Sequence, residues 1–150
     1  MKKVLFVCTG NTCRSVLAHH YAIKLAADLG LKLQFSSAGL EATPDIPQPK
    51  AVADLLAKEG VENFTHVPVM LTGKMIKAND VVLAMTAAHK AEIARRYARA
   101  AKKTYTLVEY AGFGADDIAD PYGRDDLFYF EVFKLIKAAV KAALEKLKKK

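Results

Sequence analysis

The sequence predicts a three-layer α/β sandwich, in which a four-stranded parallel sheet has helices on both faces. Short apolar runs alternate along the chain with longer stretches whose apolar residues recur every three or four positions. This alternation is typical of parallel strands, because each helix returns the chain to the start of the next strand. A chain of 150 residues has the length of one ordinary domain. Residues 1–150 are therefore expected to form a single domain.

The apolar runs predict strands at residues 4–7, 33–35, 81–85 and 105–108. The helical stretches cover residues 17–29, 51–59, 71–78, 87–101 and 130–147. Gly30 and Gly60 end the first two helices, and the last carries one apolar stripe along its length. Residues 112–125 are rich in Gly and Asp without a periodic apolar pattern, which predicts an irregular loop. Ligands of parallel sheets bind beyond the carboxyl ends of the strands, so this loop and the end of the first strand are expected to share one site.

The first strand leads into an eight-residue loop, Cys8-Thr9-Gly10-Asn11-Thr12-Cys13-Arg14-Ser15. A loop that enters a helix N-terminus gathers backbone N–H donors under the positive end of the helix dipole and so binds an anion. Gly10 and Asn11 readily adopt the positive φ that such a loop requires. The thiol of Cys8 would ionise easily there, because its thiolate is an anion that the same N–H groups and Arg14 stabilise.

A cysteine followed after five residues by arginine and serine is typical of cysteine-dependent phosphatases. With Gly10, Asn11 and Cys13 inside it, the loop resembles that of the low-molecular-weight protein phosphatases. The resemblance covers nearly the whole chain. Its further matches are Ser37-Ala38-Gly39, the run 81–85 followed by Thr86, and Asp120-Pro121-Tyr122-Gly123.

This resemblance implies three catalytic residues. Cys8 is the nucleophile that becomes a phosphocysteine, and Arg14 holds the oxygens of the phosphoryl group. Asp120 is the acid that protonates the leaving group and then the base that activates water. Composition alone does not separate Asp120 from its acidic neighbours, Asp116, Asp117, Asp125 and Asp126. The phosphate-binding residues implied are Thr9, Gly10, Asn11, Thr12, Cys13, Arg14 and Ser15.

The resemblance also implies supporting roles. Asn11 is held by a polar network with Ser15, Ser37 and His66, and Ser15 donates a hydrogen bond to the thiolate. Tyr122 forms a wall of the substrate groove. The position of Cys13 would allow a disulfide with Cys8 that protects the thiol from irreversible oxidation.

Two departures from the usual tyrosine-phosphatase pattern bear on the substrate. Thr12 stands where isoleucine is typical, and Val16 replaces the customary proline. With Leu83-Ala84-Met85-Thr86 and His89-Lys90 downstream, the chain most resembles the bacterial protein arginine phosphatases, which act on phosphoarginine. Tyr122 stands where that subgroup would have phenylalanine, so a tyrosine phosphatase remains the alternative.

Two other function classes explain part of the sequence. Thioredoxin-coupled arsenate reductases have a similar loop but need further cysteines, and none follows Cys13. A basic domain that only binds phosphorylated or nucleic-acid ligands would explain the net charge of +7. It would not explain why Cys8, Arg14 and Asp120 occur together.

Composition adds several expectations. Much of the positive charge lies at helix ends, where lysines are commonly solvated, so phosphorylated proteins and no nucleic acid are the expected partners. The chain has only two cysteines and both lie in one loop, which favours a reducing cytoplasm over a secreted location. No set of Cys and His residues has the spacing of zinc ligands, so we expect no metal, and we expect no cofactor. No signal peptide or membrane span is expected. The oligomeric state is left open.

Overall fold

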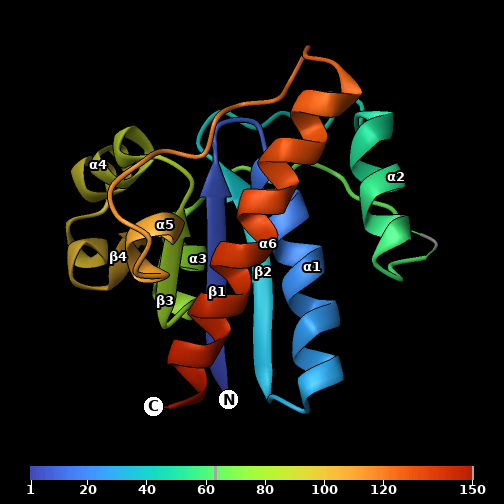
Figure 1. The fold of residues 1–150 in the computed structure, drawn as a ribbon. Helices are drawn as coiled ribbons and strands as arrows, with labels where there is room; N and C mark the ends of the chain where they lie inside the picture. Colours follow the sequence, from blue (N-terminus) through green and yellow to red (C-terminus); the bar gives the residue numbers. More distant parts are fainter. Residues whose placement is uncertain (63, 150) are drawn as a thin grey trace.

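The computed structural model describes residues 1–62 and 64–149. At its centre lies a parallel sheet of four strands in the order β2-β1-β3-β4 (Figure 1). The strands are β1 (Lys2–Cys8), β2 (Leu33–Gly39), β3 (Val81–Ala84) and β4 (Thr104–Thr106). The predicted α/β class with a four-stranded parallel sheet is confirmed.

Helices cover both faces of this sheet (Figure 1). They are α1 (Arg14–Leu29), α2 (Lys50–Lys58), α3 (Gly73–Ala78), α4 (Ala87–Arg96), α5 (Leu107–Tyr110) and α6 (Asp126–Lys148), with a 3₁₀ helix η1 (Ala98–Lys103). Successive side chains of a strand point to opposite faces. Val4 and Phe6 accordingly join the core beneath α1 and α6, whereas Leu5 and Val7 join the core beneath α3 and α4. A strand buried on both sides must be apolar at every position, which explains the continuous run in β1.

The first and last helices pack against each other on one face of the sheet. Helix α1 ends at Gly30, whose φ of 68° closes the helix in a left-handed cap. Helix α6 begins at Asp125, whose carboxylate accepts a hydrogen bond of 2.9 Å from the N–H of Phe128. The predicted stripe on α6 is buried from Phe133 onward, but Phe130 lies outside the core with 47% of its surface exposed.

Three elements differ from the prediction in where they begin or end. The fourth strand stops at Thr106 and residues 107–110 are helical, because Thr106 and Glu109 form a capping box that starts α5. The predicted helix at 87–101 divides at Tyr97 into α4 and η1. The second strand, predicted at residues 33–35, continues to Gly39 and so includes Ser37-Ala38-Gly39.

The carboxyl ends of β1, β2 and β3 meet at one edge, and their exits form the floor of the site. The N–H of Leu40 donates to the carbonyl of Cys8 at 2.9 Å, and the N–H of Met85 donates to the carbonyl of Val7 at 3.0 Å. Over the described residues, no helix has the length and apolar character needed to cross a membrane.

Candidate active site

The loop between β1 and α1 has backbone N–H groups that are free to bind a ligand. Cys8 is buried at the end of the strand, and Arg14 is the first residue of α1. The N–H groups of residues 9–13 donate no hydrogen bond to any other described residue. Donors left unpaired beside a helix N-terminus can bind the oxygens of an anion.

Two residues give the loop its shape. Asn11 has a φ of 55° and is the one non-glycine residue with positive φ among those described. Gly39, at the end of β2, lies so close to the loop that a Cβ there would be 2.5 Å from the carbonyl oxygen of Thr9 and 2.9 Å from the nitrogen of Asn11. Only glycine permits this approach, so the match at Ser37-Ala38-Gly39 has a physical reason.

The Asn11 side chain connects the loop to its surroundings. Its Oδ1 accepts hydrogen bonds from the N–H of Val69 at 2.9 Å and from Nε2 of His66 at 3.0 Å. Its Nδ2 donates to Oγ of Ser15 at 2.8 Å. The Ser15 oxygen therefore accepts from Asn11, which leaves its own hydrogen for Sγ of Cys8, 2.9 Å away. A hydroxyl that donates to this sulfur stabilises its thiolate form.

Ser37 does not join this network directly. Its hydroxyl is paired with Nδ1 of His19 at 2.9 Å, and neither Asn11 nor Ser15 hydrogen-bonds to it within residues 1–62 and 64–149. The ring of His19 stacks on His20, which contacts His66 edge-on. Three imidazole rings in contact, those of His19, His20 and His66, thus separate Ser37 from Asn11. The sequence does not reveal this chain of contacts between distant segments.

Burial lowers the pKa of His66, although a hydrogen bond to the backbone of Asn11 opposes this effect. The imidazole is therefore neutral near pH 7 and donates from Nε2 to the asparagine oxygen. This places His66, which a Thr-His-Val context alone does not distinguish from a structural histidine, in direct contact with the loop.

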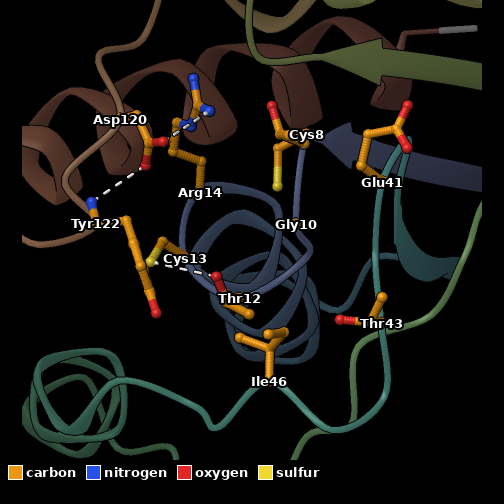
Figure 2. A pocket seen from close by; sticks show the side chains of 11 residues that line it. Cys8, Gly10, Thr12, Cys13, Arg14, Glu41, Thr43, Ile46, Asp120 and Tyr122 are labelled. Carbon is orange, nitrogen blue, oxygen red and sulfur yellow. Dashed lines mark hydrogen bonds and ion pairs between the residues drawn. The ribbon is translucent and has the colours of Figure 1, made fainter.

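Arg14 and Asp120 approach each other across the site. Arg14 is 5% exposed, and its Nη1 donates to the carbonyl of Ile118 at 2.9 Å. Its Nη2 lies 3.7 Å from Oδ2 of Asp120, and the other oxygen of that carboxylate accepts from the N–H of Tyr122 at 3.1 Å (Figure 2). Since the N–H of Ile118 donates to Met85 at 3.0 Å, the acidic segment is attached to the end of β3.

These side chains border a cavity of about 220 Å³ (Figure 2). Cys8 and Arg14 line it from the loop, and Asp120 and Tyr122 line it from the segment before α6. The remaining lining residues are Thr9, Gly10, Thr12, Cys13, Glu41, Thr43 and Ile46. Glu41, Thr43 and Ile46 belong to the segment after β2 and were not predicted, because nothing in that segment has a recognisable catalytic pattern.

Cys13 lines the cavity, and its side chain also contacts helix α6. Its sulfur lies 3.4 Å from the hydroxyl of Tyr129 and 3.6 Å from Oγ1 of Thr12. Burial raises the pKa of the Cys13 thiol, and burial together with the hydrogen bond to Cys13 raises the pKa of Tyr129. Both groups are therefore neutral at pH 7.

His89 is a further residue at this site that the sequence did not assign to it. Its Nε2 is 2.8 Å from Oγ1 of Thr9, although 80 positions separate the two residues. Burial lowers the pKa of His89 to about 4, and the Arg14 cation adds to that effect against the opposing charges of Asp117 and Asp120. The His89-Lys90 match marks the position, but only the fold shows its contact with the loop.

No group of three or more His, Cys, Asp or Glu side chains could hold a metal ion in the part of the chain that the structure describes. The groups at the cavity that can take part in phosphoryl transfer are the thiol of Cys8, the guanidinium of Arg14, the carboxyl group of Asp120 and the loop N–H groups.

Comparison with known proteins places this geometry in a family. Residues 3–150 match the model for low molecular weight phosphotyrosine protein phosphatase. A protein-arginine-phosphatase of Bacillus subtilis is 36% identical over 147 residues, which is 97% of each chain. A probable low molecular weight protein-tyrosine-phosphatase, EpsP of Ralstonia nicotianae, is 31% identical over 95% of this chain and 93% of its own.

A solved structure of YwlE arginine phosphatase superposes with a TM-score of 0.93 at 32% identity, covering 98% of this chain and 96% of its own. That structure is of a variant with serine in place of a cysteine, and its active-site serine is phosphorylated. The chain therefore belongs to the low-molecular-weight phosphotyrosine protein phosphatase family.

Proposed function

We propose that this protein is a cysteine-dependent protein phosphatase that removes the phosphoryl group from phosphoarginine. The observation that carries the proposal is that Cys8, Arg14 and Asp120 line one cavity with unpaired backbone donors beneath it. A nucleophile, a bidentate cation and a carboxyl group are the set that phosphoryl transfer through a covalent intermediate needs.

In the first step, the Cys8 thiolate attacks phosphorus while the bond from phosphorus to the arginine nitrogen breaks. Asp120 gives its proton to that nitrogen, which leaves as part of a guanidinium. The fork of Arg14 and the N–H groups of residues 9–13 hold the equatorial oxygens, over which the charge of the transition state is spread. The product is a phosphocysteine.

In the second step, Asp120 accepts a proton from a water molecule whose oxygen attacks phosphorus. The bond between sulfur and phosphorus breaks, and its electron pair returns to Cys8 as a thiolate. The Ser15 hydroxyl, 2.9 Å from Sγ, stabilises this leaving group. The phosphoserine in the variant of a relative supports a nucleophile at the cysteine position.

Thr12 supports phosphoarginine as the substrate. It is 7% exposed and lines the cavity beside Cys13 (Figure 2). Gln48 donates its side-chain N–H to the carbonyl of Thr12 and so fixes the position of the residue. A hydroxyl oxygen can accept a hydrogen bond from a guanidinium, whereas an aryl leaving group offers no donor. The protein-arginine-phosphatase of Bacillus subtilis is also among the relatives with high identity.

Thr12→Ile tests this assignment. Loss of the oxygen leaves a buried guanidinium donor unpaired at a cost of about 1 to 3 kcal/mol, which lowers kcat/KM for a phosphoarginine peptide roughly five- to over a hundredfold. Phosphotyrosine hydrolysis should hold steady or rise. Thr12→Ser keeps the hydroxyl and serves as the control, with little change in the ratio of the two kcat/KM values. An unchanged ratio in Thr12→Ile would contradict the role of Thr12.

Tyr122 is the observation that favours the second candidate, a protein tyrosine phosphatase of the same family. The residue is 54% exposed and lines the cavity, where its ring could stack on a phosphotyrosine ring. EpsP carries the name of such an enzyme.

We expect Cys13 to protect the nucleophile in this enzyme. Peroxide converts the Cys8 thiolate to a sulfenic acid, and the Cys13 thiol condenses with it to form a disulfide and release water. Mild peroxide should therefore inactivate the protein reversibly, with dithiothreitol restoring activity. In Cys13→Ala most of the activity should be lost permanently. Mass spectrometry of the oxidised wild type decides the matter, because sulfinic or sulfonic acid at Cys8 without a disulfide would contradict the protection.

The expected partners are phosphorylated proteins rather than nucleic acid, and the expected location is a reducing cytoplasm. Both thiols are free and buried, which suits such a compartment. Several of the basic residues are paired locally, among them Arg96 with Glu41 and Glu92, and Lys90 with Glu109.

A further inference from the structure

His89 makes one contact with the phosphate loop that the mechanism above does not use. Its ring is buried, with 8% of the residue exposed, and its Nε2 lies 2.8 Å from Oγ1 of Thr9. Thr9 is the residue directly after the nucleophile and lines the cavity. The residue that His89 contacts therefore belongs to the binding site itself.

The position of His89 is fixed by the start of helix α4. Its backbone N–H donates to Oγ1 of Thr86 at 3.0 Å, which caps the helix. In the same turn, the N–H of Ala87 donates to the carboxylate of Asp117 at 2.8 Å. Asp117 precedes Ile118, whose carbonyl binds Arg14. One helical turn thus holds both the segment that carries Asp120 and, through His89, the loop that carries Cys8.

The position of the proton on the His89 ring determines whether His89 or Thr9 donates the hydrogen bond between them. A neutral imidazole has one N–H and one acceptor nitrogen. Nδ1 of His89 is buried without a partner among the described residues. A proton placed there would be a buried, unpaired N–H, and such groups are rare. With the proton on Nε2, the imidazole donates to Oγ1 of Thr9, and the Thr9 hydroxyl keeps its own hydrogen for another acceptor.

An anion in the cavity also favours the arrangement in which His89 donates to Thr9. If Thr9 donated to His89, the oxygen lone pairs of the threonine would face the phosphoryl group and repel it. With His89 as the donor, the Thr9 hydrogen is available to a phosphoryl oxygen. Hydrogen bonds to a charged acceptor are about twice as strong as neutral ones.

We infer that His89 is a positioning residue for phosphoryl transfer: its Nε2–H orients the Thr9 hydroxyl so that this hydroxyl donates to the phosphoryl group. This inference rests on the proposed phosphatase function. It adds Thr9 Oγ1 to the loop N–H groups and Arg14 as a donor to the substrate.

Four variants test this inference: His89→Leu, His89→Gln, Thr9→Val and the double variant His89→Leu/Thr9→Val. Both the Leu and the Val variants should lower kcat/KM for the preferred phosphopeptide roughly 10- to 100-fold. The double variant should lose no more than the larger single loss, because both changes remove one hydrogen-bonded unit. His89→Gln carries an amide N–H near the position of Nε2 and should recover most of the activity.

Lys90→Ala is the matched control on the same helix, since Lys90 pairs with Glu109 on the surface and does not contact the loop. Thermal unfolding of each variant verifies that it is folded. Equal losses in His89→Leu and His89→Gln, or losses that add in the double variant, would show that His89 only fills space. Full activity of Thr9→Val would also overturn the inference.

Binding of inorganic phosphate separates this inference from the proposed function. Calorimetry should give a dissociation constant for phosphate that rises in Thr9→Val and in His89→Leu but not in Lys90→Ala. If the wild type hydrolyses neither phosphoarginine nor phosphotyrosine peptides, the proposed function fails. The phosphate measurement still tests whether His89 orients the Thr9 hydroxyl. If the wild type is active and the phosphate dissociation constants of Thr9→Val and His89→Leu equal that of the wild type, the inferred role of His89 is wrong and the phosphatase function stands.

Discussion

Replacing Cys8 with serine is expected to abolish turnover, with a loss on the order of a millionfold, as when another hydrolase loses its nucleophile. A hydroxyl in this loop is not ionised at pH 7, so it attacks phosphorus poorly and, once phosphorylated, leaves poorly. The change from sulfur to oxygen is small, and Ser15 can still hydrogen-bond to the new side chain. Steady-state hydrolysis of a phosphopeptide is the measurement.

The Cys8→Ser protein should keep its far-ultraviolet circular dichroism and its affinity for inorganic phosphate, because Arg14 and the loop N–H groups remain. These two properties are the control that separates lost chemistry from lost structure. Substantial turnover by a folded Cys8→Ser protein would refute the phosphocysteine mechanism.

Replacing Asp120 with asparagine should have the next largest effect, a loss of about a hundredfold to ten-thousandfold, which is the usual contribution of general acid catalysis. The loss should depend on the leaving group. A phosphoarginine or phosphotyrosine peptide needs a proton as it departs, whereas an activated aryl phosphate departs without one. The kcat/KM for a series of aryl phosphates reports the step in which the phenol departs, and its plot against the pKa of that phenol should fall more steeply in the variant than in the wild type.

Asp116→Asn is the matched control, because this neighbouring aspartate is exposed and does not line the cavity. It should leave the slope of that plot unchanged. An equal loss of kcat/KM for good and poor leaving groups in Asp120→Asn would mean that the carboxyl group does not protonate the leaving group and only shapes its segment, for instance by accepting from the N–H of Tyr122.

The sheet could be predicted because each central strand is apolar on both faces, and a run such as Val4–Phe6 has few other stable environments. The end of the fourth strand could not be predicted from the same signal. Residues 105–108 are rich in β-formers, yet the hydrogen bonds between Thr106 and Glu109 turn Leu107 and Val108 into a helix. Local capping overrode strand propensity there.

The site likewise has a part that could be predicted from the sequence and a part that could not. Its chemical centre lies in one contiguous loop, so the spacing of Cys8, Arg14 and Ser15 carries the prediction by itself. The residues that surround the loop come from the segment after β2 and from α4. Glu41 and His89 reach it only through the packing of distant elements, and no spacing in the sequence encodes that proximity.

The measurement that tests the proposed function most directly is the hydrolysis of two peptides of identical sequence, one with phosphoarginine and one with phosphotyrosine at the same position. The purified protein is assayed with each peptide, with Cys8→Ser as the blank for spontaneous loss of the labile phosphoryl group. A higher kcat/KM for the phosphoarginine peptide, with a phosphocysteine trapped by rapid acid quench, is the expected result. A higher kcat/KM for the phosphotyrosine peptide would contradict the substrate assignment, and no hydrolysis of either peptide would contradict the phosphatase function.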